Sequence, residues 1–119
     1  MDDAHQTLKS LGGQGRKLRE LIPDVYSAFV DMDRAAMKDG ALPARTKQLV
    51  ALAIAITREC DGCVASHARG AAREKATREE VAETIGVAIM MNGGPGTVWG
   101  PRALAAYEEY AEISEAPPA

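Results

Sequence analysis

The feature that most restricts the fold is an uninterrupted apolar segment from Leu49 to Ile56. A segment this short cannot cross a bilayer as a helix, because that takes about 20 apolar residues. It could form a buried strand or a helix covered on most sides, and periodicity alone does not separate the two. Its alanines, together with Pro43 in the place of a first helical turn, favour the helix. We therefore expect a central core helix over residues 46–57.

The rest of the chain also has helical patterns, and no strand pattern of any length is present. Glycines at positions 12, 13 and 15 are expected to loosen or break the first helix, and the Ala-Pro-Pro-Ala end is expected to fray. Thr77 and Glu80 have the spacing of a capping box, which marks a helix start. The further helices are expected over residues 5–22, 24–38, 61–75, 77–92 and 97–114. The prediction is an all-α, compact domain of five to six helices over residues 1–119, without a repeat or a second domain.

Length and charge limit the possible partners. A chain of 119 residues with 46% hydrophobic residues suits one globular domain with its own core. The net charge of −3 gives no basic surface for nucleic acid or for an anionic membrane, so neither is an expected partner. The acidic N-terminus, Met1 to His5, lacks the layout of a secretory signal, and we expect a cytoplasmic protein.

Chemistry is expected at the sequence Cys60-Asp61-Gly62-Cys63, which is followed by His67. If a helix begins near Asp61, Cys63 and His67 lie one turn apart, and Cys60 lies on the same stripe. A helix start also favours a thiolate over a thiol, through its free N–H groups and its dipole. A disulfide between neighbours this close would stabilise the fold little. In a cytosolic protein the pair therefore indicates redox chemistry or half of a metal site.

Other interpretations of these residues are less favoured. The cysteines could be inert buried thiols, and His67 could be an ordinary core histidine. A zinc site needs four ligands, and besides Cys60, Cys63 and His67 the chain offers at best His5 or a carboxylate. A glycine inside a helix costs about 1 kcal/mol relative to alanine, so Gly70 suggests a close helix approach.

A few large apolar residues have more than one possible place. Met90, Met91 and Trp99 are expected to fill the core or a subunit interface, with the wall of a substrate pocket as the alternative.

At several motifs the chain resembles the carboxymuconolactone decarboxylase family and, within it, the alkyl hydroperoxidase D-like (AhpD-like) branch. The resemblance is strongest over residues 40–107. It rests on Asp39-Gly40-Ala41-Leu42, on Thr46 to Ala53, on Cys60-x-x-Cys63-x-x-x-His67 and on Gly93-Gly94-Pro95. It implies an all-α fold that assembles as a homotrimer or homohexamer. It also implies an enzyme, a thiol-dependent peroxidase or disulfide reductase that uses no haem, flavin or metal.

The resemblance also implies a division of roles. Cys63 would be the thiolate that attacks the peroxide, Cys60 would be the resolving thiol, and His67 would serve in the proton relay. The residues themselves support the central step, since an imidazole one turn beyond Cys63 can take its proton. The implied partners are a hydroperoxide or disulfide substrate and a dithiol reductant that the sequence does not identify.

One position departs from the family pattern. Gln48 stands where the family has a glutamate. Glutamine can hydrogen-bond His67 and fix its ring, but it cannot accept a proton or stabilise an imidazolium by charge. Glu59, the nearest carboxylate in sequence, could take that part. We expect weak peroxidase activity and better preserved thiol–disulfide exchange.

Two other functions remain open from sequence. One is a lyase acting on a cyclic lactone acid, like the decarboxylases that name the family, although such members typically lack the cysteine pair. The other is a non-catalytic redox-sensing or metal-binding module. In each case a homo-oligomer is expected, because short helices with this much apolar surface cannot easily bury it in one subunit.

Overall fold

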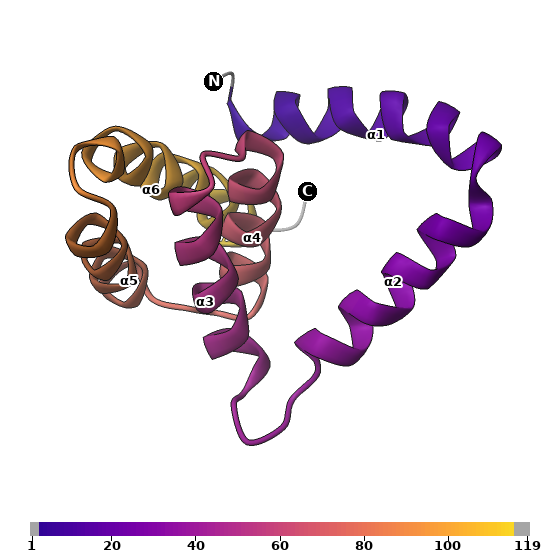
Figure 1. The fold of residues 1–119 in the computed structure, drawn as a ribbon. Coiled ribbons are helices and arrows are strands. Elements are labelled where there is room, and N and C mark those ends of the chain that lie inside the picture. Colours follow the sequence, from indigo (N-terminus) through magenta and orange to yellow (C-terminus); the bar gives the residue numbers. More distant parts are fainter. Residues whose placement is uncertain (1–2, 116–119) are drawn as a thin grey trace.

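The computed structural model describes residues 3–115, which form helices and turns without a strand (Figure 1). The all-α prediction is thus confirmed, whereas the predicted fraying of Ala-Pro-Pro-Ala falls outside the described residues. The helices are α1 (Ala4–Leu21), α2 (Pro23–Met37), α3 (Ala44–Thr57), α4 (Asp61–Arg73), α5 (Arg78–Asn92) and α6 (Gly94–Glu115). Within the described part of the chain, no helix has both the length and the apolar character needed to cross a membrane.

The core lies where α3, α4, α5 and α6 pack together. Its largest fully buried side chains are Leu52 and Ile56 of α3, Val64 of α4 and Val81 of α5. Most residues of α3 are buried or half-buried, as expected, and Val50 and Ile54 form an exposed stripe on one side of the helix. Helix α4 packs on α3, α6 and α1. The centre of the core is therefore formed by α3 and α4 together, and not by α3 alone.

The capping box predicted for α5 is present. The Glu80 N–H donates to Oγ1 of Thr77 at 3.1 Å, and the Thr77 N–H donates to Oε1 of Glu80 at 2.8 Å. The hydrogen bond from the Thr77 N–H is the largest cause that lowers the pKa of Glu80, because it favours the charged carboxylate. Two otherwise unpaired N–H groups are satisfied here, which fixes where the helix begins.

The start of α6 corrects the sequence analysis, which placed it at Thr97. Helix α5 ends at Asn92, Gly93 caps it with φ +72°, and α6 begins at once with Gly94. Pro95 then falls in the first helical turn, where an N–H has no partner within the helix. The proline that was expected to end one helix therefore helps to start the next.

Helix α1 is continuous, which corrects the expected break at its glycines. Its N-terminus is held by side chains: Asp3 accepts a hydrogen bond from the Gln6 N–H at 2.8 Å, and Glu109 of α6 accepts from the Ala4 and His5 N–H groups at 3.0 Å each. These bonds satisfy donors that a helix leaves unpaired, and they offset the low helix propensity of glycine.

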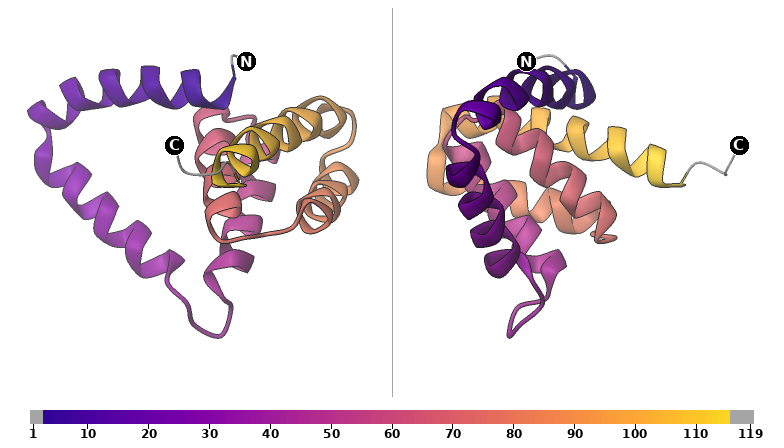
Figure 2. Two further views of the ribbon diagram at one scale, coloured as in Figure 1. Left: turned by 180° about the vertical axis from the view of Figure 1, so that it is seen from behind. Right: turned by 90° about the vertical axis from the view of Figure 1, so that its right-hand side faces the viewer.

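Helices α1 and α2 extend away from the bundle as a bent arm, and Figure 1 and the left view of Figure 2 show α2 standing apart from α4 to α6. Helix α2 has no buried residue, and Phe29 on it is 60% exposed. Helix α2 contacts only α1 and α3 to any extent. The apolar pattern of α2 therefore predicted a helix correctly, but its apolar side chains are not covered within this subunit.

The sequence did not decide the surroundings of Trp99, Met90 and Met91, and the structure puts them in different environments. Trp99 is partly buried and packs against the core, and the Arg102 guanidinium lies 4.8 Å from the centre of its ring. Met90 and Met91 are 71% and 73% exposed. A place in the core is wrong for these methionines, because they lie on the outer side of α5, whereas a place in a subunit interface stays a prediction.

Candidate functional site

The turn between α3 and α4 places the cysteine pair at the start of α4. Helix α3 ends at Thr57, and Glu59 then adopts φ +53°. The Cys60 N–H donates back to the Ala55 carbonyl at 3.3 Å. A left-handed residue after the helix end, with a bond of this kind, is a common way to satisfy the last carbonyls. The chain reverses within a few residues, so that Cys60 becomes the residue that caps α4.

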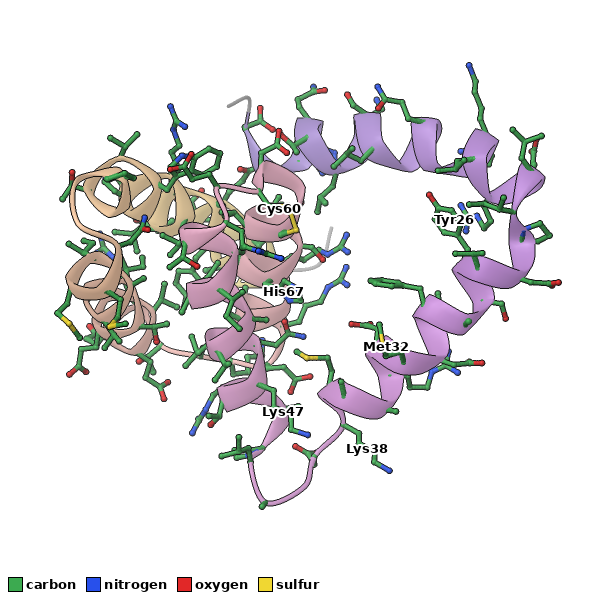
Figure 3. All side chains as sticks on the ribbon, in the orientation of Figure 1. Tyr26, Met32, Lys38, Lys47, Cys60 and His67 are labelled. Atoms are coloured by element: carbon green, nitrogen blue, oxygen red, sulfur yellow. A yellow bond between two sulfur atoms is a disulfide. The ribbon has the colours of Figure 1, made fainter. Side chains whose placement is uncertain are left out.

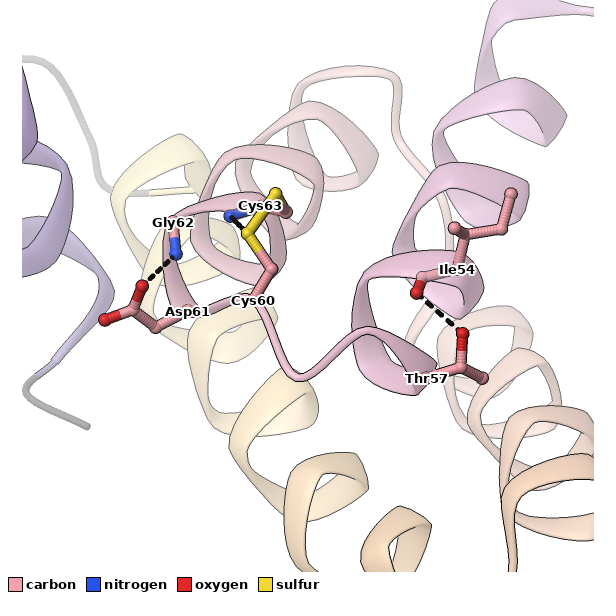
Figure 4. The surroundings of a disulfide bond; sticks show 6 residues. All are labelled: Ile54, Thr57, Cys60, Asp61, Gly62 and Cys63. Carbon is pink, nitrogen blue, oxygen red and sulfur yellow. Dashed lines mark hydrogen bonds between the residues drawn. A yellow bond between two sulfur atoms is a disulfide. The ribbon is translucent and has the colours of Figure 1, made fainter. Parts of the chain in front are cut away.

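Cys60 and Cys63 are joined by a disulfide, with their Cα atoms 5.2 Å apart (Figure 4). The Cys63 N–H points at Sγ of Cys60, 3.3 Å away, so the start of α4 supports negative charge on that sulfur. Cys60 is partly buried, whereas Cys63 is exposed. The two sulfurs therefore differ: one receives a backbone N–H, and the other is open to an incoming molecule.

His67 lies one turn after Cys63 on α4 and is half-buried. Its Nδ1 is 2.9 Å from Oε1 of Gln48, which comes from α3. With the amide oxygen as acceptor, Nδ1 carries the proton of the neutral ring, and Nε2 is left as the proton acceptor. The hydrogen bond between Gln48 and His67 that the sequence allowed is present.

Burial lowers the pKa of His67 from its ordinary value of 6.5, because the charged ring would lose hydration. The carboxylate of Asp33 on α2 opposes this effect, but it is the smaller cause. A neutral ring at neutral pH follows, and a neutral imidazole can act as a base.

An open pocket of about 570 Å³ connects these groups. Figure 3 shows Cys60 and His67 on the same side of the bundle, toward the space framed by α1 and α2. Apolar side chains from α3 form one wall, and the guanidinium of Arg58 adds a cation. The residues that line the pocket are Ala51, Ile54, Ala55, Arg58, Cys60, Cys63 and His67.

Of the five site residues that the sequence analysis named, four lie together in the structure. Cys60, Cys63 and His67 line the pocket, and Gln48 is hydrogen-bonded to His67. Glu59 is exposed on the turn before Cys60, and the carboxylate that acts on the His67 pKa is that of Asp33 instead.

Sequence reasoning missed the apolar wall, Arg58 and Asp33. Arg58 could have been found from its place beside the motif, whereas no local signal marks Asp33, which approaches from another helix. Among residues 3–115, no group of three or more histidine, cysteine, aspartate or glutamate side chains is arranged to hold a metal ion.

Acidification is expected to destabilise the fold through His67. Because its pKa is lower in the folded protein than the unfolded value of 6.5, the unfolded chain binds the proton first as the pH falls. The contribution to stability is complete above about pH 6.5 and is lost as the pH falls toward the folded pKa. Urea unfolding at about pH 7.5 and about pH 5.5 should show a smaller loss in His67→Gln than in the wild type. Equal losses in the two proteins would contradict this assignment.

The fold and the site together are those of an all-α protein with a Cys-x-x-Cys pair at the start of a helix. The model of the carboxymuconolactone decarboxylase family matches residues 23–110. The chain therefore belongs to this family.

Relatives of known structure and sequence agree with this assignment. The crystal structure of a carboxymuconolactone decarboxylase family protein from Legionella pneumophila matches with a TM-score of 0.89 and 38% identity, covering 93% of this chain and 99% of that chain. An uncharacterized protein of Cupriavidus necator is 40% identical over 106 residues, which is 89% of this chain and 94% of that protein. Uncharacterized protein 4 in the cox locus of Paracoccus denitrificans is 42% identical over 85 residues, 71% of this chain and 77% of that protein.

Proposed function

We propose that this protein is a thiol-dependent antioxidant enzyme that reduces hydroperoxides or exchanges disulfides through Cys60 and Cys63. The observation that carries the proposal is the pairing of an exposed sulfur with a sulfur held by a backbone N–H, beside a neutral histidine in one open pocket. An inert or purely structural disulfide needs neither the pocket nor the histidine. The pair closes a loop too short to restrain much of the chain.

In the reduced enzyme, Nε2 of His67 takes the proton of the Cys63 thiol. The thiolate attacks the terminal oxygen of the hydroperoxide, the O–O bond breaks, and the proton leaves with the alcohol. Cys63 is now a sulfenic acid. Cys60 attacks its sulfur, water leaves, and the disulfide is formed. One hydroperoxide is reduced as the two thiols are oxidised.

A dithiol reductant is needed to complete the cycle. Its thiolate attacks the exposed sulfur of Cys63, and the bond to Cys60 breaks. The Cys63 N–H supports the departing Cys60 thiolate, which makes it a better leaving group. The second thiol of the reductant then resolves the mixed disulfide, and both cysteines are returned to the reduced form.

We infer that disulfide exchange is the better preserved reaction. Gln48 holds the His67 ring by a hydrogen bond, but its amide adds no charge to stabilise an imidazolium. Together with the burial that lowers the His67 pKa, this makes each proton transfer from Cys63 less favourable than it would be beside a carboxylate. Exchange relies more on the leaving ability of Cys60, which the helix start supports directly.

We further propose that the enzyme works as a cytoplasmic homotrimer or homohexamer. The exposed apolar side chains of α2 support assembly, since Val25, Phe29 and Met32 are each at least 60% exposed in the single subunit. A symmetric oligomer would cover this surface.

One experiment tests the proposed activity. The reduced, metal-free protein receives one equivalent of an organic hydroperoxide, and its intact mass and free thiols are followed with time. We expect both thiols to disappear with a loss of about two mass units, as disulfide formation requires. The reaction should be slower in His67→Ala and faster in Gln48→Glu, whose carboxylate would stabilise the imidazolium. The same protein is mixed with a small aromatic disulfide to measure exchange.

Free glutathione is the reference for an unactivated thiol. Oxidation of the protein no faster than that of glutathione, together with disulfide exchange no faster than that of glutathione, would overturn the proposal. Rapid exchange with slow peroxide oxidation would support the disulfide reductase as the main activity.

A further inference from the structure

Helix α4, which follows Cys60 and contains Cys63, also contains Gly70. The side chain of Gln48 occupies the space that a side chain at Gly70 would fill. Gly70 lies three residues after His67 within α4 and is partly buried. A Cβ built on Gly70 would overlap Cδ, Oε1 and Nε2 of Gln48, all nearer than real Cβ contacts allow. The carboxamide of Gln48 therefore lies against the bare backbone of α4 at this position.

We propose that Gly70 is a positioning residue of the redox site. The absence of a side chain lets the Gln48 carboxamide lie across α4, where it binds Nδ1 of His67 and leaves Nε2 to take the proton of Cys63. The inference deepens the proposed function and rests on it for the role of His67 as a base. The packing of Gly70 against Gln48, however, stands on geometry alone.

The overlap involves the same atoms that hold the histidine. Oε1 of Gln48, which lies 2.9 Å from Nδ1 of His67, is among the atoms that a Cβ on Gly70 would displace. The end of a glutamine side chain is flexible, so it can move away from a Cβ, and in our proposal that shift breaks its hydrogen bond to His67. A ring without this acceptor is free to place its proton on either nitrogen.

Among residues 3–115, the hydrogen bond to Gln48 is the only one that the His67 ring makes. Helix α3 contributes the neutral Gln48 and the apolar wall of the pocket, and Arg58 at its end is a cation that cannot accept a hydrogen bond. Asp33 of α2 acts on the His67 pKa through its charge, and no hydrogen bond joins it to the ring among the described residues. The orientation of the ring therefore depends on Gln48, and the position of Gln48 depends on the space at Gly70.

The chain offers a matched control for a glycine inside a helix. Gly86 lies in the middle of α5, is exposed, and has nothing within 4 Å of a built Cβ. Alanine is the better helix former at both positions. Gly86→Ala should therefore raise the midpoint of urea unfolding, whereas Gly70→Ala should fail to raise it or should lower it.

The test compares the wild type, Gly70→Ala, Gly86→Ala, Gln48→Ala and the double variant Gly70→Ala with Gln48→Ala, all in the reduced form. Nitrogen-15 NMR of the His67 ring reports which nitrogen carries the proton. Alkylation of Cys63 by iodoacetamide at neutral pH, measured in a Cys60→Ser background, reports the thiolate. Urea unfolding reports stability.

We expect a single Nδ1–H tautomer in the wild type and in Gly86→Ala, and a mixture in Gly70→Ala. Alkylation of Cys63 should slow by about tenfold in Gly70→Ala, less than the roughly 10²- to 10⁴-fold that a positioned base contributes, because a mixture keeps part of the rings in the useful tautomer. With Gln48→Ala already present, Gly70→Ala should change neither the tautomer nor the rate further, and it should raise the unfolding midpoint, because the clashing carboxamide is gone. The double variant also has room for the Cβ and should fold even if Gly70→Ala does not.

Two results would overturn the inference. One is a Gly70→Ala protein that keeps the single tautomer and the wild-type alkylation rate. The other is an equal loss from Gly70→Ala with and without Gln48, which would show a general distortion of α4. The proposed function fails separately: a tautomer that depends on Gly70, in a protein that neither consumes hydroperoxide nor exchanges disulfides, would leave the positioning role intact and reject the activity.

Discussion

Replacing Cys63 with serine is expected to lower hydroperoxide and disulfide reduction by roughly three orders of magnitude or more. In the proposed mechanism this sulfur makes the first attack on the peroxide and receives the reductant, and a serine hydroxyl does neither near neutral pH. The measurement is turnover with an organic hydroperoxide and an excess of a small dithiol. The expectation follows from the exposure of Cys63 and from its place one turn before His67.

The matched variant is Cys60→Ser. It keeps the attacking thiol but cannot form the disulfide, so without added dithiol it should consume about one equivalent of hydroperoxide in a single burst and then stop. Intact mass after the burst should show one added oxygen on Cys63, and a second oxygen should appear only if more hydroperoxide is slowly consumed in forming the sulfinic acid. If Cys63→Ser gave the burst and Cys60→Ser did not, the two roles would have to be exchanged, with the sulfur that receives the backbone N–H as the attacking group.

Replacing Leu52 with alanine is expected to cost about 2 to 5 kcal/mol of unfolding free energy. Leu52 is 0% exposed in the centre of α3, one turn after Gln48, and its removal leaves a cavity between α3 and the helices packed on it. A loss of this size is a large part of the stability of a small domain. Urea unfolding at fixed protein concentration measures it, since assembly would add to the apparent stability.

The control makes the same chemical change at a site without packing. Leu21 at the end of α1 is 79% exposed, and Leu21→Ala should change the free energy of unfolding by no more than about 0.5 kcal/mol. Similar losses in the two variants would mean that burial in the single subunit does not decide stability, and that the exposed arm contributes through contacts with other subunits.

Several elements of the fold could be predicted because their signals are local. The capping box at Thr77 and Glu80 set the start of α5, and the apolar spacing of α2 predicted a helix at nearly its observed bounds. The predictions that failed depended on contacts distant in sequence. Helix α1 stays whole because Glu109, far along the chain, holds its first N–H groups. Met90 and Met91 lie outside the core because no other helix of the subunit covers that side of α5.

The sequence by itself determined the relation of Cys60, Cys63 and His67, because residues three and four apart on one helix share a face whatever the rest of the fold does. It also pointed to Gln48, through the family pattern. Only the tertiary structure decided that Gln48 meets His67 over the bare backbone of Gly70, that the Cys63 N–H supports the Cys60 sulfur, and that Asp33 approaches from α2. These relations depend on how α2, α3 and α4 pack and on how the chain turns at Glu59, and no spacing within a single helix specifies them.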